Sequence, residues 1–243
     1  MGTPVIHIPI PTKHKCKLNW DRPRETLRLM QLCSPMLPVG AYAYSQGLEF
    51  AVSSGWIKDD NATSLWIHGL LENALANLDV PLLSRLHKAW LVNDKKNVLY
   101  WNDYLFASRD SAELQAEEVQ LAHALARLLG DLGISEAVEW RENSRICFLT
   151  LFSLGIVHWK IPINDASWGY LWMWAENQVL AAIKLVPLGQ TSGQKILSSV
   201  IEIIPELVSK GLSLKDEDIG YTAPGQGIAS ALHETQYSRL FRS

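Results

Sequence analysis

The sequence has 243 residues, with 22 Lys and Arg against 25 Asp and Glu, so its formal net charge is −3. This balance argues against nucleic-acid binding and against a basic surface that docks on a membrane. Apolar residues make up 48% and charged residues 19%, which supplies a sizeable core and excludes disorder over the whole chain.

The cysteines and the apolar runs indicate the compartment. Cys16, Cys33 and Cys147 are an odd and widely spaced set, which argues against a disulfide framework and favours a reducing environment. No apolar stretch reaches the roughly 18 residues of a membrane span, and the first 20 residues lack the pattern of an export signal. We therefore expect a cytoplasmic protein.

The segment before Asp59 is predicted to contain little regular structure. Residues 1–23 carry several prolines and lysines without sustained periodicity, which indicates a flexible arm. A helix is expected from Arg24 to just before Pro35, because proline lacks the amide hydrogen and restricts the residue before it. Residues 34–40 are too rich in proline and glycine to be regular, and a short helix ending at Gly55 should follow.

From Asp59 onward, apolar residues recur at the three- and four-residue spacings of helices. Helices are expected over about 59–78, 82–92, 94–106, 110–130, 135–157, 164–186 and 190–211. Asp110 and Glu113 match a capping arrangement that opens one of them. Pro205 should kink the last.

One helix has a predicted buried stripe. It comprises Trp168, Leu171, Trp172, Ala175, Val179, Ala182, Ile183 and Val186, and Trp174 should point elsewhere. Residues 213–243 are expected to form a loop around Pro224, Gly225 and Gly227, followed by a short amphipathic end. Together these features predict a single all-α domain, a bundle of eight or more helices over residues 24–212, with mobile ends.

The search for catalytic or metal-binding motifs yields little. The seven histidines contain no pair at a metal-binding spacing. His7, His14 and Cys16 offer soft ligands for a transition metal, although a solvated arm is the alternative interpretation. Cys147, in an apolar run, is expected to be an inert core thiol. Residues 187–195 resemble a phosphate-binding loop but lack the spacing of a Walker motif.

Four motifs, in order along the chain, resemble those of the urease accessory protein UreF family. They are SPMLPVGAYAYSQGLE at 34–49, Ser108-Arg109-Asp110 with Glu113-Leu114 and Glu117-Glu118, Pro187-Leu188-Gly189-Gln190 with Gly193-Gln194, and HETQYSRLFRS at 233–243. The resemblance covers roughly residues 24 to 243, and the last motif is the most specific.

The resemblance implies a protein with no catalysis or cofactor of its own. It implies assembly with the accessory protein UreD, called UreH in some organisms, and recruitment of the GTPase UreG, which binds GTP. The complex would dock on apo-urease and help to insert nickel, with this chain modulating the partner's GTP hydrolysis. The resemblance further implies a homodimer.

Two segments are predicted to contact partners. In the tail, Tyr237, Leu240 and Phe241 would share one apolar face if helical, with Arg239 and Arg242 as planar donors beside it. The tail candidates are Gln236, Tyr237, Ser238, Arg239, Leu240, Phe241 and Arg242. Tyr42 and Tyr44 are the candidates in the proline-rich loop. The alternatives are a tail that packs back on its own domain and a loop that only seals the end of the bundle.

Two other functions stay open at this stage. One is a small all-α enzyme whose site sequence spacing does not reveal. The other is a nickel carrier that uses the N-terminal arm.

Overall fold

The computed structural model describes residues 22–220 and 223–243, which form helices and no strands. The α-helices are α1 (Pro23–Leu32), α2 (Leu48–Ser53), α3 (Asp60–Leu70), α4 (Asp79–Leu91), α5 (Lys95–Ala107), α6 (Ala112–Asp131), α7 (Phe148–His158), α8 (Ile163–Leu185), α9 (Gln190–Ser213) and α10 (Pro224–His233). Shorter turns are η1 (Ala41–Ala43), the π-helical η2 (Leu71–Leu75), η3 (Ser135–Trp140) and η4 (Asp216–Asp218). The all-α prediction is confirmed.

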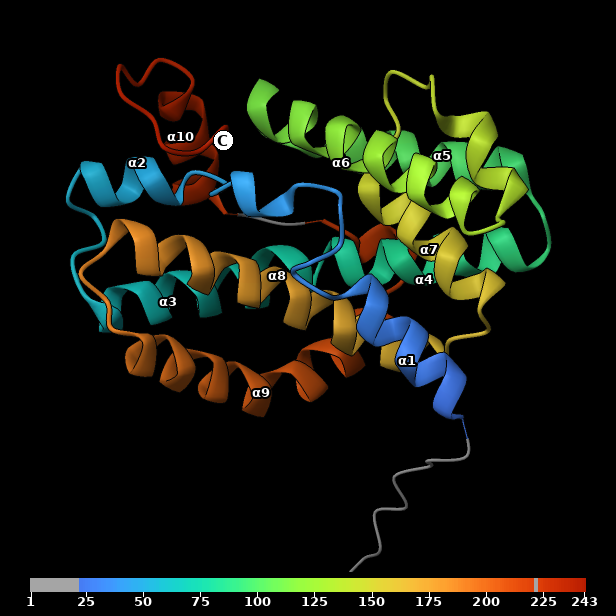
Figure 1. The fold of residues 1–243 in the computed structure, drawn as a ribbon, viewed down its shortest axis with the longest axis horizontal. Helices are drawn as coiled ribbons and strands as arrows, with labels where there is room; N and C mark the ends of the chain where they lie inside the picture. Colours follow the sequence, from blue (N-terminus) through green and yellow to red (C-terminus); the bar gives the residue numbers. More distant parts are fainter. Residues whose placement is uncertain (1–21, 221–222) are drawn as a thin grey trace, which may run out of the picture.

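Helix α8 packs against most of the helices at one end of the molecule. Figure 1 shows it crossing the middle of the fold between α2 and α9, with α3 behind it and α1 laid across its outer side. Helices α4 to α7 gather at the other end. Helix α9 contains Pro205, and its ribbon is bowed, which agrees with the expected bend.

Side-chain caps explain where several helices begin. Asp59 accepts a hydrogen bond from the Ala62 amide at the start of α3. The cap of α6 is Ser111, whose backbone is extended and whose hydroxyl accepts from the Leu114 amide at 3.1 Å. The predicted cap at Asp110 was therefore wrong by one residue.

The predicted helix 135–157 is interrupted. Only Phe148–His158 is α-helical, and nearly all of it is buried, while Ser135–Trp140 is a 3₁₀-helix followed by turns. Asn102 of α5 causes this break: its side chain donates to the Arg145 carbonyl and accepts from the Cys147 amide, both at 2.9 Å. A buried tertiary partner thus satisfies backbone groups that a continuous helix would have paired internally.

The predicted stripe of α8 is buried except at its first residue: Leu171, Ala175, Val179, Ala182 and Val186 are buried, and Trp172 and Ile183 are half-buried. Trp168 is 43% exposed, whereas Trp174, which was expected to point elsewhere, is buried. The prediction was wrong at these two tryptophans because α8 packs against helices on several sides, so its buried residues extend beyond one stripe.

The helices near the two chain ends both begin at a proline. Helix α1 begins at Pro23, next to the expected start near Arg24, because proline suits the first position of a helix. Pro224 does the same for α10, so the expected loop around Pro224, Gly225 and Gly227 is helical.

A small second core joins segments far apart in the sequence. It contains Leu48, Ala51, Ile57, Ala181, Ala182, Val186, Ala229 and Phe241. Gly47 makes the close approach possible, because its φ is +85° and a Cβ there would lie 2.9 Å from the Ser230 amide nitrogen. Among the described residues, no helix is both long and apolar enough to cross a membrane.

Candidate functional site

The first and last motifs of the sequence meet in space. Figure 1 places the chain end beside α2 and α10. The amides of Ser45 and Gln46 donate to the backbone oxygen of Ser243 at 2.6 and 3.1 Å. The Arg242 amide donates in turn to the Ala43 carbonyl at 2.8 Å. Residues 236–243, here called the tail, are therefore fixed against the segment before α2.

Glu49 holds the tail from α2. Its carboxylate is buried and accepts hydrogen bonds from the backbone amides of Leu240, at 2.7 Å, and Phe241, at 2.8 Å. It also lies 3.1 Å from Nε2 of His233. Backbone amides and a ring nitrogen thus replace the water that a buried carboxylate would otherwise need.

Glu113 holds the tail from α6. One of its oxygens lies 2.7 Å from Nδ1 of His233, and the other accepts from the guanidinium of Arg239. The His233 side chain, at the end of α10, is completely buried between the two glutamates. The tail is therefore connected through charged groups to α2, α6 and α10.

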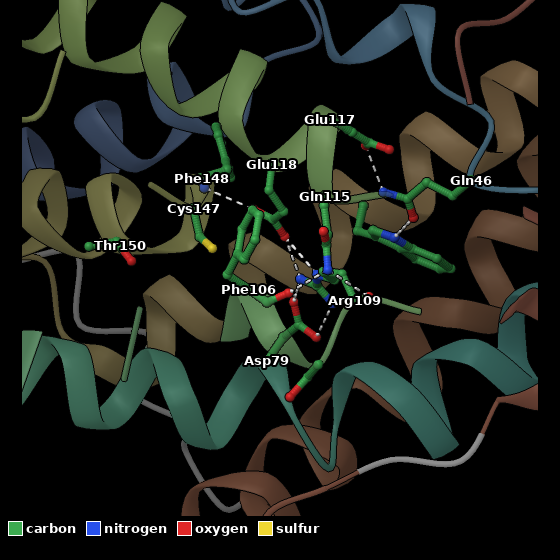
Figure 2. Close-up of polar contacts among 12 residues, drawn as sticks. Gln46, Asp79, Phe106, Arg109, Gln115, Glu117, Glu118, Cys147, Phe148 and Thr150 are labelled. Carbon is green, nitrogen blue, oxygen red and sulfur yellow. Dashed lines mark hydrogen bonds and ion pairs between the residues drawn. The ribbon is translucent and has the colours of Figure 1, made fainter. Parts of the chain in front are cut away.

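Glu117 lies one turn further along α6. Its carboxylate accepts from Gln46 Nε2 at 2.8 Å and from the Ser243 hydroxyl at 3.0 Å. Gln46 also accepts from the indole of Trp174 at 2.8 Å, and Figure 2 shows its side chain reaching toward Glu117. Burial raises the pKa of Glu117 to about 7, and the Gln46 hydrogen bond opposes that shift.

A buried ion cluster lies beside these contacts. Arg109 stands between Asp79 and Glu118 in Figure 2, with N–O distances of 2.7 and 2.6 Å. Tyr170 donates to Asp79, and Glu118 accepts from the Phe148 amide at the start of α7. Burial by itself lowers the pKa of Arg109, but the two carboxylates raise it well above its ordinary value.

A cavity of about 110 Å³ lies between the 34–46 segment and helices α4, α6 and α8. Tyr42, Gln46, Asp79, Arg109 and Glu117 are among its lining residues. The Glu117–Gln46 pair and the ion cluster around Arg109 therefore border the same cavity, next to the proline-rich loop.

Comparison with known proteins decides the family. The sequence model of the UreF family matches residues 57–201. A protein of Alkalilimnicola ehrlichii called urease accessory protein UreF is 50% identical over 216 residues, which cover 89% of this chain and 95% of the relative. The chain belongs to the UreF family. A protein of Teredinibacter turnerae with the same description is 47% identical over 90% of this chain and 99% of its own length.

The structure separates the two predicted tyrosines of this UreF family member. Tyr42 is 63% exposed, but Tyr44 is buried, and its hydroxyl hydrogen-bonds to Gln120 of α6. Burial raises the pKa of Tyr44. The expectation that both rings are displayed was therefore wrong for Tyr44, because its ring fills the core beneath the loop.

The tail is not helical, so its predicted apolar face does not exist. Tyr237 is fully exposed and Leu240 is 66% exposed, but Phe241 points into the second core. Arg239 and Arg242 bond to Glu113 and Gln120 of α6, and Gln236 donates to the Ser238 carbonyl. The tail expected to be free packs on its own domain, as the alternative interpretation proposed, while keeping an exposed apolar edge.

The metal candidates His7, His14 and Cys16 lie outside the described residues. Within the described ranges, no group of three His, Cys, Asp or Glu side chains could hold a metal ion. Cys33 and Cys147 are buried, and burial raises the pKa of the Cys33 thiol to about 12 and that of Cys147 well above its ordinary value. Both are structural thiols.

Sequence reasoning missed the residues that hold the site together. Glu49, Glu113 and His233 all occur in the quoted motifs, but Glu113 was assigned only a helix-capping role and the other two none. For Glu49, the sequence feature that could have indicated its role is a charge within an apolar run, Leu48-Glu49-Phe50-Ala51-Val52. Such a position is occupied by a charge only where a partner is supplied.

Replacing Arg109 should strongly destabilise the fold. Arg109→Met leaves Asp79 and Glu118 buried without their cation, and we expect a loss of about 3–5 kcal/mol in the free energy of unfolding. Lys95→Met, which breaks the exposed pair with Glu139, should cost less than about 1 kcal/mol. Urea unfolding followed by circular dichroism measures both, and equal losses would contradict the analysis.

Glu117 should make stability depend on pH. Because its folded pKa of about 7 exceeds the ordinary 4.5, the folded state binds the proton more tightly, and stability falls as pH rises through this window. In Glu117→Gln, the decrease in the free energy of unfolding over this pH range should be smaller by up to about 3 kcal/mol. Urea unfolding between pH 4.5 and 8 tests this, with the exposed Glu202→Gln as control. An unchanged pH slope in Glu117→Gln would refute the assignment.

Proposed function

We propose that this chain is an adaptor in urease maturation, which assembles with UreD/UreH and UreG on apo-urease and supports GTP-dependent nickel insertion. The family and the descriptions of its relatives support a role as a urease accessory protein. Nickel is the cargo of the complex and GTP the ligand of its partner. The chain acts in the cytoplasm by binding proteins, and it modulates the partner's hydrolysis without catalysis of its own.

The observation that carries the proposal is the exposed edge of an otherwise fixed tail. The backbone of residues 240–243 is bonded to α2 and to the segment before it, yet the Tyr237 and Leu240 side chains project outward. A preorganised segment loses little conformational entropy when it binds. Tyrosine is also among the residues that most often anchor protein interfaces. This edge is the proposed contact for UreD/UreH.

A second contact is proposed at the loop before α2. Tyr42 is exposed and lines the cavity mouth, and Met36 nearby in the sequence is also exposed. Tyr44, two residues further along the loop, packs in the core and fixes the loop that carries the exposed Tyr42 ring. This loop is the proposed contact for UreG. Exposed Leu27 and Met30 on α1 offer a further apolar face for pairing two copies of the chain.

The tail contact is tested by changing only its exposed side chains. Tyr237→Ser combined with Leu240→Ser keeps the backbone bonds to Glu49 but removes the apolar edge, so we expect co-purification with UreD/UreH to fall by about 100-fold or more. Leu91→Ser with Val92→Ser, an exposed apolar pair at the end of α4, is the matched control. Normal capture of the tail variant would reject the assignment.

The loop contact is tested with a single tyrosine. Tyr42→Ala should abolish recruitment of UreG while leaving the unfolding midpoint close to that of the unmodified chain, because the ring is mostly outside the core. Tyr100→Ala on α5 removes a comparably exposed ring elsewhere and should retain recruitment. If Tyr42→Ala recruits UreG normally, the loop only seals the bundle.

A further inference from the structure

The imidazole of His233 is buried with a carboxylate at each ring nitrogen. Nδ1 lies 2.7 Å from Glu113 Oε2, and Nε2 lies 3.1 Å from Glu49 Oε2. An ionised carboxylate only accepts hydrogen bonds, so both contacts are favourable only if each ring nitrogen carries a proton. This geometry corresponds to the charged imidazolium form.

The same two carboxylates hold residues 239–241. Glu49 accepts the Leu240 and Phe241 amides, and Glu113 accepts the Arg239 guanidinium. With His233 protonated, two positive and two negative groups balance at this junction. If His233 loses its proton, one ring lone pair faces a carboxylate oxygen and the junction carries one uncompensated negative charge. In a buried site such an imbalance costs far more than it would in water.

We propose that His233 is a proton-dependent latch for the tail. As imidazolium it positions Glu49 and Glu113 to hold residues 239–241, and loss of its proton releases them. The imidazole can exchange a proton with solvent, whereas the guanidinium of Arg239 stays charged, so His233 is the group in this junction that can switch the charge balance. The latch is a property of the isolated chain and holds whether or not the tail contacts UreD/UreH.

Other charged groups surround the latch and must be separated from it. On α6, Glu117 bonds to Ser243 and has a pKa near neutrality, so it is the main competing source of pH dependence. Glu234 accepts the Ala112 amide, and Asp110 lies against Gly227 of α10. Lys184 of α8 lies over the Phe241 ring. Glu117→Gln therefore belongs in the experiment as a comparator.

The protonation state is measured directly on the full chain. Nuclear magnetic resonance of ¹⁵N-histidine-labelled protein distinguishes a ring with two protonated nitrogens from a neutral ring. We expect His233 to carry both protons while the tail is docked. A ring that is neutral while the tail amides are protected would overturn the latch, and so would a ring that keeps both protons over the whole pH range in which the chain stays folded.

Release of the tail is measured by hydrogen exchange, corrected for the intrinsic effect of pH. The protection factor of amides 239–241 should fall about tenfold or more as the ring loses its proton, which corresponds to losing one charge-assisted hydrogen bond. Protection in buried α7 should not follow this step. Unchanged tail protection while the ring titrates would also overturn the proposal.

The variants assign the effect to His233. His233→Gln cannot be charged, so its tail should exchange rapidly and without a pH step, whereas Glu117→Gln should retain the step. His123→Gln, at a half-buried histidine of α6 that contacts the Asn143 carbonyl, is the matched control and should behave as the unmodified chain. If His233→Gln does not fold, the measurements on the unmodified chain decide the question.

Discussion

A carboxylate buried at the start of a six-residue helix is the constraint on which the candidate site depends. Glu49 accepts two backbone amides from the tail and faces the ring of His233. A charge in such a place is tolerated only when donors surround it. The tail, α2 and α10 must therefore assemble together, and the loop before α2 is fixed by the same event through its bonds to Ser243.

Helix α6 extends this constraint into the body of the fold. Its glutamates at 113 and 117 face the tail and the Gln46 side chain, and Glu118 pairs with Arg109, which reaches Asp79 on α4. One helix thus connects the two surfaces proposed for partners, the loop at Tyr42 and the tail at Tyr237. The charges along this helix also affect one another, because, beside the larger effect of burial, Glu118 raises and Arg109 lowers the pKa of Glu117.

Much of the fold could be predicted from local pattern. The helical spacing from Asp59 onward and the all-α class were confirmed. A helix was wrongly predicted where a side chain distant in the sequence takes the place of a backbone hydrogen-bond partner. Asn102 bonds the Arg145 carbonyl and the Cys147 amide, and the predicted helix is interrupted there. On α8 only Trp168 and Trp174 were misplaced, because a helix that packs on several sides buries residues beyond one stripe.

The sequence alone determined most of the helices, the family resemblance and the two segments that form the candidate site, because these depend on residue spacing and on short motifs. Only the tertiary structure decided that the segments touch, that Tyr44 is buried while Tyr42 is exposed, and that the tail is irregular and docked. The reason is that burial and pairing of charge are properties of the assembled fold. Glu49 and His233 have neighbours nearly two hundred residues apart in the chain, and no local periodicity records them.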